Sequence, residues 1–519
     1  MEQKETLSEL LSEVLKLDTK DAAKAVGENG FIPDIDEKIA RLEELKTPWS
    51  PEERFVKCKT VDELITIIKG VKQGQILRIA GSQHSIPEAV FSKNTVQAIN
   101  VKLDGDFRKF DELFEQDGST FVRVGAGCNL GIDPSDKDSN AENSFNRCIT
   151  KKGFALPVLG GLSHQTIAGF MLTGSAGGSL KHSFGDAIHS IEFIDGTGKP
   201  QKFTNGDEEF FAAGVSMGLF GVITFVTLKL VPNYRVAGVE ATVHFAESVV
   251  RSGSIFQQAL KDEEFMHCVW FPQKNVENVM QFRGRAVEPT TPIMPYKHLL
   301  HKRITNYLAA GVLYIINELQ FNATALRKII ASLLLNMINP PNASDFCDEW
   351  YIALPSDDQA MVDTVMRTQF TEVWIDVEHV NDVLKALSKL FADDELAGGN
   401  FGIELYGAKK SSFWLSPAYG RDVVRVDPFW WEHNPHGKPE EFFTKYWKVL
   451  LTIPTARLHW GKHMPKVGTS FGDITIGPDY VKKSFNDHNN FDKWMVLRER
   501  FDPQQIFVTD YWRAHFGIQ

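Results

Sequence analysis

The chain has 519 residues, enough for two or more domains that each bury a hydrophobic core. Its 56 basic and 67 acidic residues give a net charge of −11, which argues against a nucleic acid or an acidic membrane as the partner. The five cysteines show no CxxC or metal-ligand spacing, so we expect a reducing compartment and no metal site.

The N-terminal 50 residues indicate a charged helical extension that ends near Pro48 and Pro51. Its first residues form an acidic amphipathic pattern, unlike the basic end and apolar centre of a signal peptide. Further on, residues 304–317 and 329–341 are strongly apolar, but each is shorter than the ~18 residues that cross a bilayer. We favour a buried helical hairpin there over a membrane-surface element, and a cytoplasmic or other intracellular soluble protein without a transmembrane span.

Residues 51–235 show the alternation of helix and strand patterns that an α+β unit requires. The pattern predicts a helix over 61–74, strands over 75–82, 96–103 and 121–127, a hairpin over 188–203, and a helix, glycine turn and long strand over 210–232. Residues 236–455 are richer in aromatic residues and alternate strands with helices, and 456–519 return to a mixed pattern. We therefore expect boundaries near 51, 236 and 456.

The stretch GFALPVLGGLSHQTIAGFMLTGSAGGSLKHSFG (153–185) is apolar, repeatedly broken by Gly, Ser and Thr, and almost uncharged before Lys181. Regular helices and strands gain nothing from that glycine density. It suits close approach of the backbone to a large ligand, with N–H groups available for anionic or carbonyl oxygens. The turn RIAGSQHSIPE (78–88) can hold a pyrophosphate in the same way. With the segment around His459, these two stretches indicate a flavin site.

Four ordered motifs then identify a resemblance. GSQHS (81–85) resembles a GSGHS phosphate loop, and LPVLGGLSHQTIAGFMLTGSAGG (156–178) is similar to LPxLGSIxxQTIAGAIxTGTHGSG. SMGLFGVITFVTLKLVP (216–232) is similar to SLGxLGVVTxxTLxxxP. HWGK (459–462) and FDPQQIF (501–507) are similar to a C-terminal HWGK and DPxxxF. The chain resembles the vanillyl-alcohol-oxidase-type flavoproteins, in the branch of aldonolactone and alditol oxidases, over about residues 54–519.

The resemblance implies an α+β fold in which a two-part FAD-binding domain of the PCMH type is joined to an antiparallel-sheet substrate (cap) domain with helices. The FAD-binding domain would hold residues 51–235, the cap domain 236–455, and 456–519 would return to the FAD-binding domain. The implied cofactor-binding residues are Gly81, Ser82, Gln83, His84, Ser85, Gly160, Gly161, Ser163, Thr166, Ala168, Gly169, Thr173, Gly174, Ser175, Gly221, Val222, His459 and Lys462.

His84 stands where the family can carry FAD through an 8α-histidyl bond, and we favour that bond over a turn histidine beside non-covalent FAD. Gln83 replaces the usual glycine, so the turn needs a different dihedral or accepts strain. Ala176 replaces a histidine, so one cofactor contact is missing or rebuilt. Cys128 fits a small buried thiol better than a second flavin attachment.

Glu404, Tyr406, Lys462 and Asp427 are the candidate catalytic residues, and Phe170, Trp374 and Trp414 the candidate substrate pocket. Glu404 and Tyr406 are two apart in a predicted strand, so both side chains point the same way. The resemblance places an arginine at position 406, a histidine near 427 and a small polar residue at 170. These departures favour a substrate larger and more apolar than a simple polyol, including one with a cationic nitrogen facing Asp427 or Glu404.

These observations predict an FAD-dependent oxidase that takes hydride from a CH–OH, or a CH–NH, small-molecule substrate. Dioxygen would re-oxidise the flavin and give hydrogen peroxide. The alternatives are a dehydrogenase with another electron acceptor, a biosynthetic oxidative cyclase or desaturase, and a flavin-binding protein that has lost catalysis. The sequence leaves the substrate and the oligomeric state open.

Overall fold

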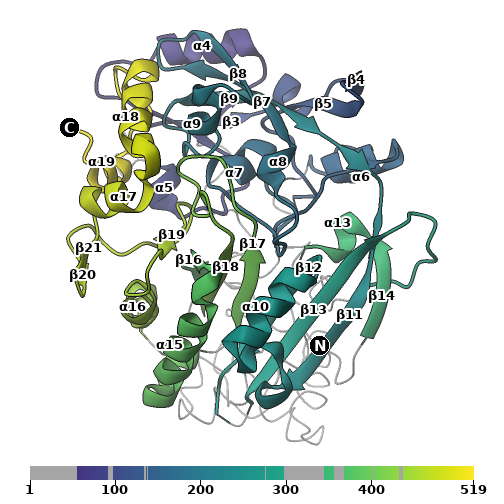
Figure 1. Cartoon of the computed structure of the whole chain (residues 1–519). Helices are drawn as coiled ribbons and strands as arrows, with labels where there is room; N and C mark the ends of the chain where they lie inside the picture. Colours follow the sequence, from purple (N-terminus) through teal and green to yellow (C-terminus); the bar gives the residue numbers. More distant parts are fainter. Residues whose placement is uncertain are drawn as a thin grey trace, which may run out of the picture.

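A computed structural model describes residues 55–91, 98–133, 136, 138–274, 276–296, 344–355, 368–399, 401–431 and 437–519. Figure 1 shows an upper part, built from the first half of the chain and the C-terminal helices, above one large sheet formed by the middle of the chain. The predicted extension at 1–50 and the predicted hairpin at 304–341 lie outside the described residues. No described helix has the length and apolar character needed to cross a membrane.

The upper part begins with a small parallel sheet in the order β1-β3-β2, made of β1 (Val56–Cys58), β3 (Ala98–Leu103) and β2 (Ile76–Ala80). Parallel strands of one sheet need a crossover, and α4 (Val61–Lys69) connects β1 to β2, which lie at opposite edges of this sheet. Thr60 caps this helix by accepting a hydrogen bond from Glu63 N at 3.2 Å. The helix and strands predicted at 61–74, 75–82 and 96–103 are confirmed.

The second sheet of the upper part is antiparallel, in the order β4-β5-β9-β7-β8. Its strands are β4 (Phe114–Gln116), β5 (Ser119–Gly125), β9 (Gly221–Lys229), β7 (Ile188–Asp195) and β8 (Pro200–Thr204). The predicted hairpin at 188–203 is β7-β8, and Gly198 takes the left-handed φ of 79° that its turn requires. The predicted helix, turn and strand at 210–232 are α9 (Glu208–Ala213) and β9.

The glycine-rich stretch is mainly irregular, with only the short helix α7 (Ile167–Leu172) and the strand β6 (Phe154–Ala155) between α6 (Phe145–Lys151) and α8 (Phe184–Ala187). Thr166 caps α7 by accepting a hydrogen bond from Gly169 N at 3.2 Å. Ser179 and Ala408 form an isolated bridge, so this stretch reaches the large sheet. It therefore lies between the two parts of the molecule.

The large sheet has nine strands, eight of them in the order β14-β11-β13-β12-β17-β18-β16-β19, with β15 paired to β18. All its pairs are antiparallel. The strands are β11 (Arg235–His244), β12 (Phe265–Phe271), β13 (Asn278–Val287), β14 (Ser344–Glu349), β15 (Thr368–Phe370), β16 (Val373–Asp376), β17 (Ile403–Ala408), β18 (Val423–Trp431) and β19 (Arg457–Leu458). Helices α10 (Gly253–Asp262), α15 (Val380–Asp393) and α16 (Pro439–Leu450) lie on one side of it (Figure 1).

The C-terminal helices α17 (Pro478–Phe485), α18 (Asn490–Phe501) and α19 (Asp510–Phe516) pack on the upper part. The Phe501 ring lies 5.2 Å from that of Phe193 on β7, and Leu77 N of β2 donates to Ile506 O at 2.7 Å. The remaining elements are short: α5 (Pro87–Val90), β10 (Val231–Pro232), α13 (Trp350–Ala353), β20 (Ser470–Phe471), β21 (Ile474–Thr475) and 3-10 turns at 105–108, 245–247, 249–251, 377–379, 395–398 and 487–489. The α+β fold with an antiparallel-sheet domain is confirmed, while the domain boundaries stay predictions.

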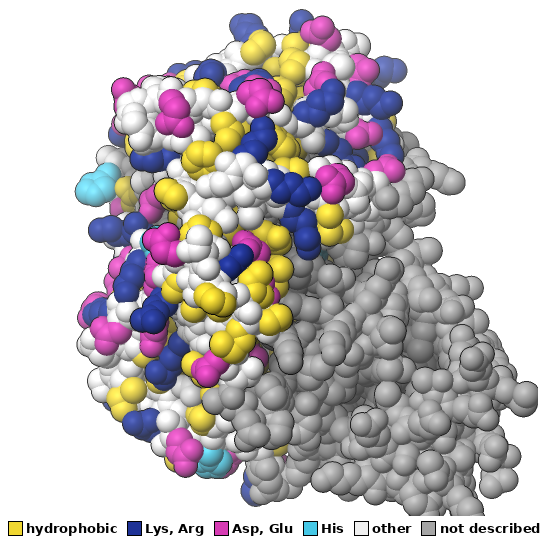
Figure 2. Space-filling view, turned by 90° about the vertical axis from the view of Figure 1, so that its right-hand side faces the viewer, with side chains coloured by type: hydrophobic (Ala, Val, Ile, Leu, Met, Phe, Trp, Pro, Cys, Tyr) yellow, Lys and Arg dark blue, Asp and Glu magenta, His cyan; other side chains and the backbone are white. Residues whose placement is uncertain are grey.

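Figure 2 shows the molecule from the right-hand side of Figure 1. On the described part of this face, basic and acidic side chains are interspersed, and hydrophobic ones gather near the middle. Such mixing is usual for a protein surface that faces water.

Candidate active site

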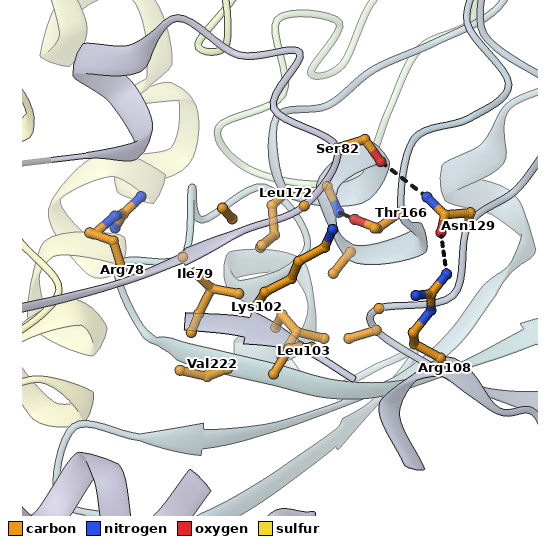
Figure 3. Close-up of a pocket in the computed structure, with 18 of the residues that line it drawn as sticks. Arg78, Ile79, Ser82, Lys102, Leu103, Arg108, Asn129, Thr166, Leu172 and Val222 are labelled. Atoms are coloured by element: carbon orange, nitrogen blue, oxygen red, sulfur yellow. Dashed lines mark hydrogen bonds between the residues drawn. The ribbon is translucent and has the colours of Figure 1, made fainter. Parts of the chain in front are cut away.

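Two adjoining cavities lie in the upper part of the molecule. The first lies between the two small sheets and is lined by residues of β2, β3, β9 and the glycine-rich stretch (Figure 3). The second continues past the turn that follows β2 and ends against Trp460 and Trp512. Both share Gly81, Ser82 and Thr166, so together they form one elongated groove.

The turn after β2 has the unusual backbone that the sequence predicts. Gln83 has a φ of 61°, in the left-handed region where glycine is favoured. Gly81 is required by close approach, because a Cβ there would lie 2.6 Å from Thr166 Oγ1. The chain therefore keeps the glycine-type conformation at position 83 without a glycine, and accepts the strain.

Hydrogen bonds tie this turn to the glycine-rich stretch. Ser82 Oγ donates to His164 O at 2.9 Å, and Asn129 Nδ2 donates to the same carbonyl at 2.8 Å and to Ser82 Oγ at 3.0 Å. Figure 3 shows Asn129 between Ser82 and Arg108, whose Nη2 lies 3.4 Å from Asn129 Oδ1. Ser82, Asn129 and the His164 carbonyl therefore form one hydrogen-bond network.

Most of the predicted cofactor residues line the groove: Gly81, Ser82, Gln83, His84, Ser85, Thr166, Ala168, Gly169, Thr173, Gly221 and Val222. The others lie outside these two cavities: Gly160, Gly161, Ser163, Gly174, Ser175, His459 and Lys462. Gly160 is backed by the Phe170 ring, which a Cβ would approach to 2.6 Å, and Ser175 Oγ is 3.2 Å from Thr173 Oγ1.

Cys128 is 2% exposed, and its thiol donates to Lys109 O at 3.4 Å. Burial raises the pKa of this thiol to about 12. An un-ionised thiol is a poor nucleophile, as expected for a small core residue.

Three of the four candidate catalytic residues, Tyr406, Glu404 and Asp427, lie on one face of the large sheet, in two cross-strand rows. Tyr406 pairs with His267 on one side and Arg425 on the other, and Arg425 pairs in turn with Trp374. The neighbouring row pairs Glu404 with Asp427. Directly paired residues point to the same side of a sheet, as do residues two apart in one strand. As expected, Tyr406 and Glu404 share a face, and the Tyr406 hydroxyl donates to Glu404 Oε2 at 3.2 Å.

Arg425 stands at the centre of these rows. Its Nη2 lies 2.7 Å from Asp427 Oδ2 and 3.0 Å from Glu372 Oε2, and its Nη1 donates to Ala176 O at 2.7 Å. Its guanidinium carbon is 4.2 Å from the centre of the Tyr406 ring and 4.7 Å from that of Trp374. The arginine thus joins the large sheet to the glycine-rich stretch. The contact is made at Ala176, the position where the resemblance expects a histidine.

Burial and charge set the protonation of this cluster. Burial works against the charge of Arg425, but Asp427 and Glu372 raise its pKa above the ordinary value. Burial also opposes ionisation of Glu372, yet Arg425 holds the pKa of this carboxyl well below its usual range. For Asp427 burial prevails, and the pKa is raised. Glu372 is therefore the carboxylate that balances Arg425.

The HWGK segment connects this cluster to the groove. His459 stacks on Trp374 at 5.7 Å, and burial lowers its pKa to about 4. Lys462 Nζ lies 3.5 Å from His84 O and 3.6 Å from the centre of the Phe370 ring. Lys462 therefore lies between the turn of the groove and strand β15 of the large sheet.

The three predicted substrate-pocket residues lie at three different places in the structure. Trp374 lies within the charged cluster, where its Nε1 donates to Glu372 Oε2 at 3.0 Å. Phe170 is fully buried on α7 against Phe184, with ring centres 4.8 Å apart. Trp414 is buried near α18, where Lys493 Nζ lies 5.7 Å from its ring.

The sequence reading missed Arg425, Glu372, His267 and His164. Arg425 had a signal, because VVRVDP places two charged residues two apart in an apolar strand, and so on one face. His267 is buried, with its pKa lowered to about 4 by burial. Glu372 and His164 offer no such pattern, since their positions depend on contacts across the fold.

The groove fits FAD by the shape of its backbone. Its first cavity is lined by five glycines, so backbone rather than side chains forms part of the wall: Gly81, Gly127, Gly169, Gly218 and Gly221. The pyrophosphate would lie along the turn at 81–85, which lines the second cavity. Among the described residues, no group of three or more His, Cys, Asp or Glu is arranged to hold a metal ion.

This fold and groove define an FAD-dependent oxidoreductase, and the comparisons with known proteins agree. A family model described as "FAD binding domain" matches residues 52–204, and one described as "D-arabinono-1,4-lactone oxidase" matches residues 226–515. The second match covers more than half of the chain. The chain therefore belongs to the D-arabinono-1,4-lactone oxidase family.

Individual relatives are distant. A D-arabinono-1,4-lactone oxidase from Kluyveromyces lactis is 25% identical over 243 residues, which span 46% of this chain and 42% of the relative. An L-gulono-1,4-lactone dehydrogenase from Mycobacterium tuberculosis is 21% identical over 455 residues, covering 87% of this chain and 92% of the relative. Thus less than half of the fungal relative is matched.

Among solved structures, a cholesterol oxidase from Brevibacterium sterolicum has a TM-score of 0.64 at 14% identity, covering 88% of this chain and 92% of that chain. At this identity the likeness concerns the fold. It supports the α+β architecture in which an FAD-binding part is joined to an antiparallel-sheet part.

Proposed function

We propose that the chain is an FAD-dependent oxidase that removes hydride from the CH–OH group of a neutral, hydroxylated ring compound. Sugar lactones of the kind named for its relatives are the leading class. The observation that carries the proposal is the set of cross-strand rows with Tyr406, Arg425, Glu404 and Asp427, facing the glycine-rich stretch. When bound, FAD supplies the two-electron acceptor for the hydride.

The charges of the site favour a neutral substrate. Asp427 is in contact with Arg425 at 2.7 Å, and Glu372 at 3.0 Å. A cationic nitrogen facing Asp427 would have to compete with this buried guanidinium, so the amine alternative loses its main support. The aromatic faces of Tyr406 and Trp374 flank the cluster and suit the apolar face of a ring.

Glu404 is the proposed proton acceptor for the substrate hydroxyl. It is partly exposed while its neighbours in the strand are buried, and the Tyr406 hydroxyl orients its Oε2. Lys462 is the proposed cation that stabilises negative charge as the flavin is reduced and oxygen reacts. His84 is the proposed site of an 8α-histidyl bond to FAD, since it lines the groove at its second cavity.

The proposal is tested by mixing the purified protein anaerobically with D-arabinono-1,4-lactone, L-gulono-1,4-lactone, xylitol, cholesterol and benzylamine, and following the loss of flavin absorbance. A lactone should reduce the flavin and benzylamine should not. Glu404→Gln should slow reduction by roughly 100-fold or more while the oxidised spectrum stays unchanged. The control is Glu395→Gln, because Glu395 is exposed in the 3-10 turn at 395–398 that precedes β17. Reduction by the amine alone would contradict the proposal.

The electron acceptor is tested separately. The reduced protein should consume dioxygen and give an equal amount of hydrogen peroxide. Fast reduction of a quinone dye with slow oxygen consumption would instead favour the dehydrogenase alternative, which the name of the mycobacterial relative makes worth testing.

A further inference from the structure

The first cavity of the groove is lined by charged as well as apolar side chains. Its basic residues are Arg78, Lys102 and Arg108, and its acidic residues are Asp133 and Asp136. The formal charge of this lining is therefore positive, whereas the whole chain carries −11. The guanidinium of Arg78 already donates to four backbone carbonyls. Lys102 and Arg108 instead face the cavity beside a carboxylate that they share.

That shared carboxylate is Asp136. Its Oδ2 lies 2.8 Å from Arg108 Nη1 and 3.6 Å from Lys102 Nζ, and its Oδ1 accepts a hydrogen bond from Asp138 N at 3.0 Å. Burial opposes ionisation of Asp136, but the Asp138 N–H and the two cations hold its pKa below the usual range. A single carboxylate thus faces two cations, and the contact to Lys102 is the longer one.

Lys102 lies beside the turn that would receive the pyrophosphate of FAD. In the parallel register of β2 and β3 it pairs with Ala80, the last residue of β2 before that turn. It also shares the first cavity with Gly81 and Ser82. Figure 3 shows the Lys102 side chain extending through the cavity toward the side on which Ser82 lies. The flexible stem of a lysine lets its ammonium group reach an anion held there.

Arg108 is connected to the same turn by hydrogen bonds. Its Nη2 lies 3.4 Å from Asn129 Oδ1, and Asn129 Nδ2 donates to Ser82 Oγ at 3.0 Å (Figure 3). The guanidinium is therefore fixed by Asp136 on one side and by Asn129 on the other. Lys102 has the looser position, because its side chain is 28% exposed and that of Arg108 only 17%.

We propose that Lys102 and Arg108 bind the phosphate oxygens of FAD, and that the pyrophosphate replaces Asp136 as the partner of Lys102. This inference rests on the proposed function only through the FAD site, and neither on the substrate nor on a covalent bond. Charge-assisted hydrogen bonds from Lys or Arg to phosphate are about twice as strong as neutral ones. The backbone of the turn then supplies only part of the binding, and Asp136 competes with the cofactor for Lys102.

The test measures the affinity for FAD in the full chain carrying His84→Ala, so that no covalent bond forms at the proposed attachment residue and binding stays reversible. The flavin-free protein is titrated into FAD at several salt concentrations, and the change in flavin fluorescence is followed. Adding Lys102→Met should weaken binding roughly 10- to 100-fold at low salt. The affinity of this variant should also vary less with salt, because a charge pair that salt screens has been removed.

Asp136→Asn should act in the opposite direction. It keeps an oxygen for the Asp138 N–H but removes the negative charge that competes with phosphate, so FAD should bind roughly 2- to 5-fold more tightly. Lys102→Arg keeps the positive charge and should retain most of the affinity. Lys109→Met is the matched control, because Lys109 is 72% exposed and pairs with Asp106 at the surface. It should leave the affinity unchanged.

Two results would overturn the inference. The first is an unchanged affinity for FAD in Lys102→Met. The second is weaker binding by both Lys102→Met and Asp136→Asn, which would show that the ion pairs only hold the cavity in shape. If the His84→Ala chain does not bind FAD, the same variants are compared in the wild-type chain by their rate of FAD uptake, with the same expected order. None of these results bears on the proposed reaction, which is tested by flavin reduction.

Discussion

At the scale of single residues, Arg425 carries more of the candidate site than any residue that the sequence singled out. It contacts two carboxylates, two aromatic rings and the carbonyl of Ala176 while being 4% exposed. A buried ion pair contributes little compared with an apolar replacement, but removal of one partner leaves a charge without compensation. The arginine therefore matters mainly because Glu372 and Asp427 are present.

Arg425→Met should destabilise the protein by about 3–5 kcal/mol, because it leaves the Glu372 carboxylate buried without its counter-charge. The double variant Arg425→Met with Glu372→Gln should recover a large part of that loss. The measurement is the midpoint of chemical denaturation with FAD bound. Arg421→Met is the control, since this arginine is 25% exposed and pairs with a half-exposed Asp487. Equal losses in the single and the double variant would contradict the charge argument.

Glu240 gives a prediction that depends on pH. It is 3% exposed on β11 and accepts a hydrogen bond from the Tyr296 hydroxyl at 2.5 Å. Burial raises its pKa from 4.5 to about 7. Between these values the folded chain keeps a proton that the unfolded chain has lost, so stability falls as pH rises, by about 1.4 kcal/mol per pH unit.

Glu240→Gln removes this titration. Below pH 4.5 the wild-type protein should be at least as stable as the variant, and the difference should turn in favour of the variant as pH rises toward 7. Melting temperatures of both proteins across this range check the expectation. A difference that stays constant with pH would show that the pKa of Glu240 is the same in the folded and the unfolded chain.

At the scale of elements, the regular strands could be predicted and the site could be predicted only in part. Alternation in IHSIEFID and glycines in the following turn define the β7-β8 hairpin, and the same rule places Glu404 and Tyr406 on one face. The partner of Tyr406 across the sheet depends on the register between β17 and β18, which no local pattern contains. Arg425 was missed for that reason, and Glu372 because it lies just before β16.

The glycine-rich stretch is the element whose backbone the groove needs most. Gly177 lies so close to Leu159 O and the Val158 side chain that a Cβ would overlap both. Gly177→Ala should therefore push the stretch away from Leu159. Because Thr166, Ala168 and Gly169 of the same stretch line the groove, FAD binding should weaken and the melting temperature of the FAD-bound protein should fall. Gly398→Ala is the matched control, because a Cβ there would meet nothing nearer than 3.6 Å. Normal FAD binding by Gly177→Ala would show that the stretch can shift to admit a methyl group.

At the scale of the whole molecule, distant parts of the sequence form the FAD-binding part together. The first cavity is lined by Leu77 and Phe507, which are far apart in the chain, and Asp502 accepts hydrogen bonds from the backbone N–H groups of Ile506 and Phe507. Phe501 packs on Phe193 of β7. The C-terminal segment therefore shapes a groove whose other walls come from the first half of the chain.

Arg78 is the side chain that joins these parts. Its guanidinium donates to the carbonyls of Ala89 and Val90 on α5, of Met217 before β9, and of Phe507 in the C-terminal segment, at 2.8–3.1 Å. Burial lowers its pKa to about 10, so it remains charged at neutral pH. A change to an apolar residue would leave several buried carbonyls without donors, and each unsatisfied group costs about 1–3 kcal/mol.

Arg78→Met should therefore loosen the C-terminal segment more than the large sheet. In hydrogen exchange of the FAD-bound protein, residues 502–519 and the loop around Met217 should exchange faster than in the wild type, while β11, β12 and β13 keep their protection. Arg500→Met is the control, because that arginine is half exposed and contacts Glu209 at the surface. Uniformly faster exchange in both parts would mean that they unfold as one unit, and unchanged exchange at 502–519 would mean that packing of the helices alone holds the segment in place.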